Sequence, residues 1–152
     1  MRKGLDQLVL ALATGLGFGC SPFIPATVGA LWGIPQAWWM GHRSPVIFVL
    51  VQVVILLVAV LLCDRAERLL GRKDDRRIVA DEIATLPLVM IGLPVASSPW
   101  LLFSGFVLHR IFDVLKPWPA RWIQRVPGGP GIVLDDVFSS VYALAFNWGV
   151  FL

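Results

Sequence analysis

The sequence predicts an all-α membrane protein, a compact bundle of four to five transmembrane helices with an N-terminal interfacial or re-entrant segment. Hydrophobic residues make up 57% of the 152 residues and charged residues only 15%, whereas roughly 25% of an average soluble domain is charged. The mean hydropathy of +0.77 agrees, and one apolar run is long enough to cross a bilayer. No internal repeat or linker interrupts the chain, so a single membrane-embedded domain over residues 1-152 is expected.

The clearest predicted span is Val46–Cys63, which is apolar except for Gln52. At about 1.5 Å per residue it is about 27 Å long, enough to cross a thin hydrocarbon core. The N-terminal segment Leu5–Phe18 is expected to lie in the interface or to re-enter. A four-span version, in which Val28–Met40 does not cross, stays open. Pro35 and Pro87 lie within two of the remaining predicted spans and should kink them. These remaining spans are Val28–Met40, Ile83–Pro94, Trp100–Leu115 and Ile132–Leu152.

Loop charges predict the orientation of the bundle. The predicted loop Asp64–Arg77 is strongly basic, and Lys116, Arg121 and Arg125 follow the fourth span. The loops at the opposite ends of the spans carry almost no charge, so the positive-inside rule places the basic loops in the cytoplasm. The net charge of +3 is thereby explained by topology, and no nucleic acid partner is expected.

Acidic residues gather at the same predicted face. Asp81 and Glu82 begin the third predicted span, Asp113 ends the fourth, and Asp135 and Asp136 begin the fifth. Three helix ends thus bring carboxylates to a similar membrane depth. This convergence is the main functional signal in the spacing of the residues.

Each acidic feature alone also has a structural explanation. A carboxylate at a helix N-terminus gains about 0.3–1 kcal/mol from the helix dipole, and Asp113 could form a local ion-pair ladder with Arg110 and Lys116. Together, however, adjacent carboxylates near the membrane core repel one another and need a cation. Ligation by oxygen alone favours magnesium or calcium over zinc.

Groups suited to binding an anion lie beside these carboxylates. Arg110 and Lys116 flank the end of the fourth span, and Gly128 and Gly129 precede the fifth. Glycines let backbone N–H groups approach an anion closely, although a plain turn explains the pair equally well. The stretch Gly15–Gly29 is rich in glycine and proline, which predicts irregular backbone lining a cavity.

Other functional classes fit less well. A cation transporter would distribute ionisable residues through the membrane depth, and Val46–Cys63 contains none. The loop of cysteine phosphatases, the DxDx[TV] aspartyl nucleophile and the DGxxAR signature of phosphoalcohol transferases are all missing from the sequence. A non-catalytic membrane-assembly protein stays open as an alternative.

Three blocks resemble the phosphatidylglycerophosphatase A family of bacterial membrane enzymes. They are GFGCSPFIPATVGAL (Gly17–Leu31), DDRRIVADE (Asp74–Glu82) and HRIFDVLKPWPARWIQRVPGGPGIVLDD (His109–Asp136). The resemblance extends roughly from Gly15 to Tyr142. It implies magnesium-dependent hydrolysis of phosphatidylglycerophosphate to phosphatidylglycerol and phosphate, at the cytoplasmic face of the bacterial inner membrane, by a multi-pass protein.

The resemblance also implies roles for particular residues. The catalytic and Mg²⁺-binding set is Asp81, Glu82, Asp113, Asp135 and Asp136, and which of them acts as base or nucleophile stays open. We expect the substrate phosphate to meet Arg110, Lys116, Gly128 and Gly129. We expect a substrate loop that contains Ser21, Pro22, Pro25 and Thr27, and Asp75 as a possible accessory carboxylate.

This sequence departs from the family pattern at five positions. Ala26 and Thr85 replace usual glycines, Gln124 replaces a common aspartate, and Ser139–Ser140 replace an Ala-Gly pair. We interpret the changes as repacking of small-residue helix contacts plus the loss of one accessory carboxylate. A relative with an altered substrate is the alternative that these changes raise.

Overall fold

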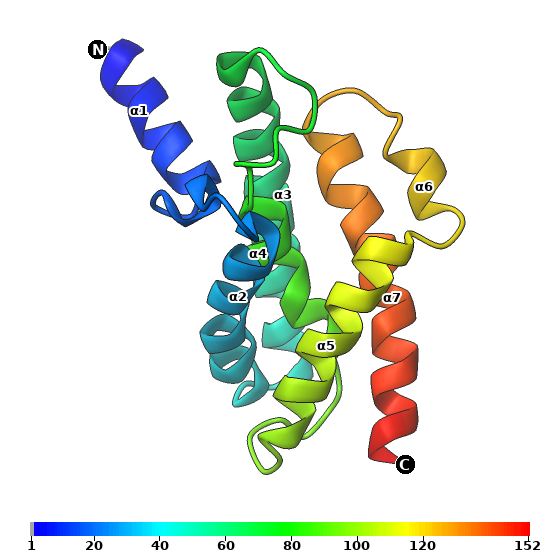
Figure 1. The fold of residues 1–152 in the computed structure, drawn as a ribbon. Helices are drawn as coiled ribbons and strands as arrows, with labels where there is room; N and C mark the ends of the chain where they lie inside the picture. Colours follow the sequence, from blue (N-terminus) through cyan, green and yellow to red (C-terminus); the bar gives the residue numbers. More distant parts are fainter. Residues whose placement is uncertain (1) are drawn as a thin grey trace.

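The computed structural model describes residues 2–152, and every regular element in that range is a helix (Figure 1). The prediction of an all-α fold is therefore confirmed. The elements are α1 (Arg2–Ala13), the 3-10 helix η1 (Phe18–Cys20), α2 (Pro25–Gly41), α3 (Pro45–Leu70), α4 (Ala80–Thr85), the 3-10 helix η2 (Leu86–Met90), α5 (Trp100–Leu115), α6 (Ala120–Ile123) and α7 (Gly129–Phe151).

Helix α3 contains the predicted span and continues beyond it. Ser44 caps its N-terminus by accepting a hydrogen bond from the Ile47 N–H at 3.4 Å. The apolar run ends at Cys63, but the helix ends only where Gly71 adopts a left-handed conformation. The prediction that a loop begins at Asp64 is wrong, because polar residues at helical spacing continue the helix as an amphipathic extension.

The third predicted span is broken as its proline requires. Helix α4 changes at Leu86 into the 3-10 helix η2, which has Pro87 in its first turn. Proline has no N–H to donate, and the regular α-helix ends just before Pro87. The lone polar residue of the α3 span serves this junction, since the buried Gln52 amide donates to the Ala84 carbonyl oxygen at 2.7 Å.

The Gly15–Gly29 stretch is irregular only in its first part. Gly15, Leu16 and Gly17 have positive φ angles, which ends α1. From Pro25 onward the chain is the helix α2, so the prediction of irregular backbone as far as Gly29 is wrong. A proline in the first helical turn favours this start.

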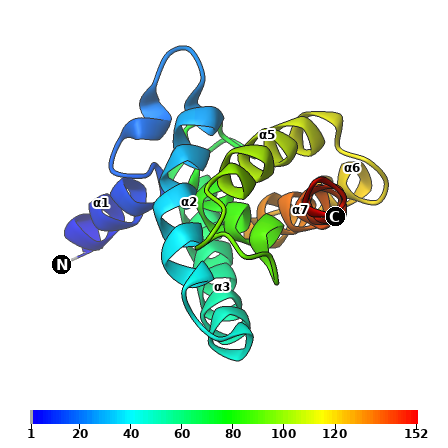
Figure 2. The ribbon, with the colours of Figure 1, turned by 90° about the horizontal axis from the view of Figure 1, so that it is seen from below.

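Helices α2, α3, α5 and α7 surround the short α4–η2 unit (Figures 1 and 2). Helix α1 lies at the edge of the bundle, where it packs against α3. Helix α2 approaches the start of α4 closely because Gly29 has no side chain. A Cβ at this position would overlap the side chain of Val79, which precedes α4. The central position of α4 places its first turn between α5 and α7.

Two of the described helices, α3 and α7, are long and apolar enough to cross a membrane. One side of α3 exposes a row of large apolar side chains, including Leu50, Val54, Leu57 and Leu61. An apolar surface of this kind needs lipid or a partner to cover it. The count of four to five crossings and the interfacial role of the N-terminal segment stay predictions.

Candidate active site

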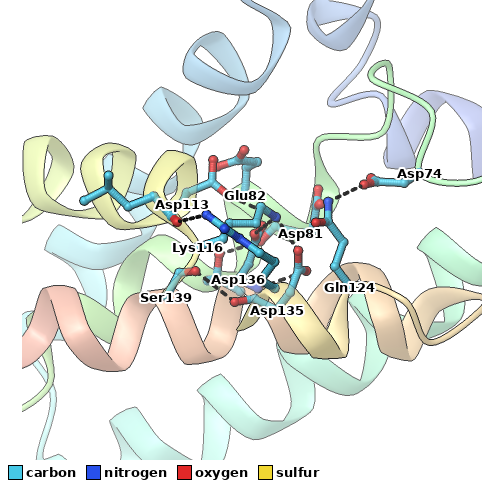
Figure 3. A network of polar contacts seen from close by, with 12 residues as sticks. Asp74, Asp81, Glu82, Asp113, Lys116, Gln124, Asp135, Asp136 and Ser139 are labelled. Atoms are coloured by element: carbon cyan, nitrogen blue, oxygen red, sulfur yellow. Dashed lines mark hydrogen bonds and ion pairs between the residues drawn. The ribbon is translucent and has the colours of Figure 1, made fainter. Parts of the chain in front are cut away.

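Three helices bring five carboxylates to one cleft. Asp81 and Glu82 come from α4, Asp113 from α5, and Asp135 and Asp136 from α7 (Figure 3). The convergence expected from the sequence is therefore present. The cleft has a volume of about 260 Å³ and is lined by Pro25, Ala26, Asp74, Arg76, Ile78, Asp81, Glu82, Asp113, Lys116, Gln124, Ile132, Asp135 and Asp136.

Glu82, Asp113 and Asp136 form the tightest group in the cleft. One carboxylate oxygen of each lies within 4.8 Å of the others, and all three residues are buried. One oxygen of Asp81 and one of Asp136 are also buried without a hydrogen-bond partner within the described part of the chain. Buried carboxylate oxygens in this arrangement fit a hard cation that prefers oxygen ligands.

The helix dipole does not explain the α7 pair. Asp81 and Glu82 do lie in the first turn of α4, as a dipole explanation requires. Helix α7, in contrast, begins at Gly129 and has no acidic residue in its first turn. The prediction that Asp135 and Asp136 begin this helix is wrong. Because the dipole effect falls off within the first turn, their burial calls for another source of positive charge.

Lys116 supplies part of that charge. Its ammonium forms an ion pair with Asp135 and lies 3.5 Å from Asp113 Oδ1 and 3.6 Å from Asp136 Oδ1. Lys116 follows the last residue of α5 and has a positive φ of 43°. Burial would lower the pKa of this ammonium, but Asp136 and Asp135 outweigh burial and raise it above its usual value.

Arg110 contacts the same cluster from the side of α5. Its guanidinium lies 2.6 Å from Glu82 Oε2 and 3.1 Å from Asp113 Oδ2. It thus joins α4 to the end of α5 and fixes both carboxylates. Arg110 is not part of the cleft lining, whereas Arg76, which sequence reasoning missed, is.

His109 supports the cluster from behind. It is buried, and its Nε2 lies 3.1 Å from the Thr85 hydroxyl. Its Nδ1 lies 3.8 Å from Glu82 Oε2.

A buried acidic cluster of this kind fits a phosphatase, a cation transporter or a non-catalytic membrane protein, and comparison with known proteins decides between these classes. The sequence model of the phosphatidylglycerophosphatase A family matches residues 11–151. The chain belongs to this family.

Curated relatives support the same assignment. The chain is 35% identical to phosphatidylglycerophosphatase A of Escherichia coli strain K12 over 144 residues, which cover 90% of this chain and 83% of that protein. It is 33% identical to phosphatidylglycerophosphatase A of Haemophilus influenzae over 135 residues, which cover 88% and 82%. No solved structure is significantly similar to the chain. The matched residues 11–151 include all six carboxylates that line the cleft.

The acidic pair at positions 74 and 75 divides differently from the prediction. Asp74 lines the cleft, and its Oδ2 accepts a hydrogen bond from Gln124 Nε2 at 3.1 Å. Asp75, the expected accessory carboxylate, instead pairs with Arg77 at 2.8 Å and is not part of the lining. The hydrogen bonds from Arg77 lower the pKa of Asp75 to about 2.

The glycines expected to bind phosphate serve the protein's own carboxylates. The Gly128 N–H donates to Glu67 Oε1 at 3.2 Å, and the Gly129 N–H donates to Asp64 Oδ1 at 3.4 Å. Neither glycine lines the cleft. Because side chains of α3 occupy their N–H donors, the structure gives no support to the phosphate-binding role expected for them, which stays a prediction.

Only part of the expected substrate loop reaches the cleft. Pro25 lines it, whereas Ser21, Pro22 and Thr27 do not. Pro22 is exposed in the segment between η1 and α2, and Thr27 lies in α2. The structure therefore brings the start of α2, rather than the whole segment, against the carboxylates.

The five positions expected to depart from the family pattern fall into two structural groups. Ala26 and Gln124 line the cleft. Thr85, Ser139 and Ser140 are buried between helices, where the Ser140 hydroxyl donates to the Thr85 carbonyl at 3.3 Å. The first group touches the space available to substrate, and the second group joins α4 to α7.

Proposed function

We propose that the chain hydrolyses the terminal phosphomonoester of phosphatidylglycerophosphate and leaves phosphatidylglycerol and inorganic phosphate. The reaction breaks the bond between phosphorus and the glycerol oxygen, a water oxygen takes its place on phosphorus, and the glycerol oxygen gains a proton. The observation that carries the proposal is the buried group Glu82, Asp113 and Asp136 beside Lys116, in a member of this phosphatase family.

We propose Mg²⁺ as the cofactor, held by carboxylates of Asp81, Glu82, Asp113, Asp135 and Asp136. When bound there, the ion supplies positive charge for the phosphoryl oxygens and favours the deprotonated form of a water. The unpartnered buried oxygens of Asp81 and Asp136 support a cation at this place.

The chain's own groups would do the remaining work. Lys116 and Arg76 line the cleft and offer cations to the phosphate oxygens. Arg110 holds Glu82 and Asp113 in fixed positions, so these two need not reorganise when substrate enters. A carboxylate of the cleft then accepts the proton of the attacking water.

We propose a single multi-pass membrane domain over residues 1–152 in the inner membrane of a bacterium, with the cleft facing the cytoplasm. The lengths and composition of α3 and α7 support membrane crossing. The basic segments on both sides of the cleft, which include Arg76 and Arg121, support the cytoplasmic orientation.

Phosphate release by purified protein tests the activity. Detergent-solubilised protein should release phosphate from phosphatidylglycerophosphate with Mg²⁺ and not with EDTA. Asp113→Asn and Asp136→Asn should each lower kcat by at least about a hundredfold, as loss of a group that stabilises transition-state charge does. Asp6→Asn, at a half-buried aspartate that pairs with Arg65 outside the cleft, serves as a matched control that should keep full activity.

A negative result would also be informative. If folded protein releases no phosphate with any divalent cation, the phosphatase assignment fails and a non-catalytic relative or a cation transporter takes its place. Release that persists in both cleft variants would mean that the chemistry happens outside this cleft.

A further inference from the structure

A second, basic pocket adjoins the acidic cleft. It has a volume of about 430 Å³ and lies where α5 ends and α6 begins, lined by Leu115, Lys116, Pro117, Trp118, Arg121, Trp122 and Arg125. Three of these residues are cationic and none is acidic. The neighbouring cleft has the opposite character, with six carboxylates in its lining.

The two arginines of this pocket are free to bind a ligand. Both are exposed, and within residues 2–152 neither guanidinium forms an ion pair. Arg121 donates one hydrogen bond to the Leu115 carbonyl at 3.1 Å, and Arg125 takes part through its backbone oxygen, which accepts from Lys73. Guanidinium groups so placed match the geometry of phosphate oxygens.

Two tryptophans place the pocket at the membrane surface. Trp118 is 80% exposed and Trp122 is 64% exposed. Exposed tryptophans beside arginines are typical of the layer where lipid headgroups lie. A soluble anion would gain nothing from these two indoles, so the surroundings favour a lipid.

Lys116 joins the two pockets because it lines both. A lipid with two phosphate groups separated by a glycerol unit could therefore occupy both at once. We propose that the basic pocket, lined by Lys116, Arg121 and Arg125 among others, binds the phosphodiester of an anionic phospholipid and thereby presents the lipid's terminal phosphate to the acidic cleft. The link to catalysis rests on the proposed function; the binding of the phosphodiester does not.

Binding without turnover tests the pocket by itself. Protein in phosphatidylcholine nanodiscs with EDTA is titrated with dihexanoyl-phosphatidylglycerol, dihexanoyl-phosphatidylcholine and inorganic phosphate. We expect the first to bind at least about tenfold more tightly than the other two, and Arg121→Gln/Arg125→Gln to lose this advantage. Arg125→Glu alone should also lose this advantage, because it puts a negative charge in the pocket. The variant should still fold, since within residues 2–152 Arg125 makes no side-chain hydrogen bond and only its backbone oxygen accepts one.

Arg43→Gln provides the matched control. Arg43 is likewise an exposed arginine beside a tryptophan, 4.6 Å from the Trp39 ring, but it follows α2 at the opposite end of the bundle from α6 (Figure 1). The variant should bind phosphatidylglycerol as the unmodified protein does. Equal binding of the phosphatidylglycerol and phosphatidylcholine probes, or unchanged binding in Arg125→Glu, would overturn the proposal. Tighter binding of inorganic phosphate would overturn the lipid as ligand.

Kinetics then separate this proposal from the proposed function. In Arg121→Gln/Arg125→Gln, KM for dihexanoyl-phosphatidylglycerophosphate should rise about tenfold or more, while kcat stays within a factor of about two. A lipid-binding pocket in a protein without phosphatase activity would show the binding result alone. A fall in kcat with unchanged KM would contradict a role in holding the lipid.

Discussion

The five acidic side chains from α4, α5 and α7 outnumber the lysine and arginine side chains that pair with them. Within the described residues only Lys116 and Arg110 do so. Without a bound cation the cluster must therefore either hold unpaired negative charge in a buried place or take up protons to neutralise it, and either costs stability. Sites of this kind trade stability for function.

Asp136→Asn should stabilise the protein in EDTA by roughly 0.5–2 kcal/mol because it removes one repelling charge and keeps the shape. The same variant should gain less stability from added Mg²⁺ than the unmodified protein does, since one of the proposed ligands is weaker. Thermal unfolding in detergent, with EDTA and with Mg²⁺, measures both effects. Asp6→Asn, at an exposed ion pair with Arg65, should show neither, and destabilisation of Asp136→Asn in EDTA would contradict the explanation.

Asp75 provides a pH dependence whose sign follows from its lowered pKa. Its folded pKa of about 2 lies below the usual value of about 3.9, so the pair with Arg77 stabilises the fold above a pH of about 4. This contribution is lost as the pH falls from about 4 to about 2. Asp75→Asn should therefore destabilise the protein at neutral pH, by about 1 kcal/mol because Asp75 is buried but the Arg77 side of the pair is 44% exposed to solvent, and by less at a pH of about 3.

Unfolding of Asp75→Asn and the unmodified protein at neutral pH and at a pH of about 3 measures this difference. In an Arg77→Gln background the Asp75→Asn substitution should have little effect at either pH. An effect of Asp75→Asn that grows as the solution is acidified would contradict a lowered pKa for this carboxyl group.

At this scale the sequence predicts the chemistry of the site better than its details. Adjacent carboxylates on three helices could be recognised from spacing alone, and the cleft contains all of them. Which of Asp74 and Asp75 enters the cleft depends on loop torsions, including the positive φ of Asp74. Spacing carries no information on these torsions, and Arg76 escaped notice for the same reason.

At the scale of elements, α3 and α7 fix one another through the start of α7. Gly129 lies so close to α3 that a side-chain Cβ there would overlap the Val60 carbonyl oxygen. The hydrophobic pattern predicted both helices, but it missed the last turns of α3 and the first of α7. These turns are held by Asp64 and Glu67 accepting hydrogen bonds across the interface, an interaction between distant positions that local patterns do not reveal.

Gly129→Ala should destabilise the protein by roughly 1–3 kcal/mol, because the added methyl group forces two helices apart. Gly149→Ala lies in the same helix and meets no atom within 4 Å. That control should be neutral or stabilising by up to about 1 kcal/mol, since alanine favours helix over glycine. Thermal unfolding in detergent compares them, and equal effects of the two variants would refute the close contact.

For the whole molecule, the exposed side of α3 determines the environment that the protein needs. Composition predicted a membrane protein, and α3 and α7 satisfy the length and hydropathy that crossing requires. The shorter predicted spans are less readily recognised, because η2 interrupts one of them and proline occurs within α2. Their path depends on packing around α4, which composition does not encode.

Leu57→Arg should impair membrane integration, since an arginine at the centre of a span costs roughly 2.5–3.5 kcal/mol. Leu57 is 61% exposed on α3, so the loss would come from contact with lipid rather than from the core. Leu57→Phe keeps the apolar character and should integrate normally. The fraction that stays with membranes after alkaline carbonate extraction is the measurement, and full retention of Leu57→Arg would show that this side of α3 does not face lipid.

The hydrogen bonds from the start of α7 to Asp64 and Glu67 of α3 also constrain the length of α7. Asp64 and Glu67 hold the first residues of α7 in place. The direction in which the two carboxylates farther along that helix point therefore depends on how many residues separate them from its start. Each residue of an α-helix turns by about 100°. A one-residue insertion between Gly131 and Asp135 would therefore rotate Asp135 and Asp136 out of the cleft while leaving the composition of the helix almost unchanged. The number of residues between the start of α7 and its two carboxylates is thus under tighter constraint than the identity of the apolar residues between them.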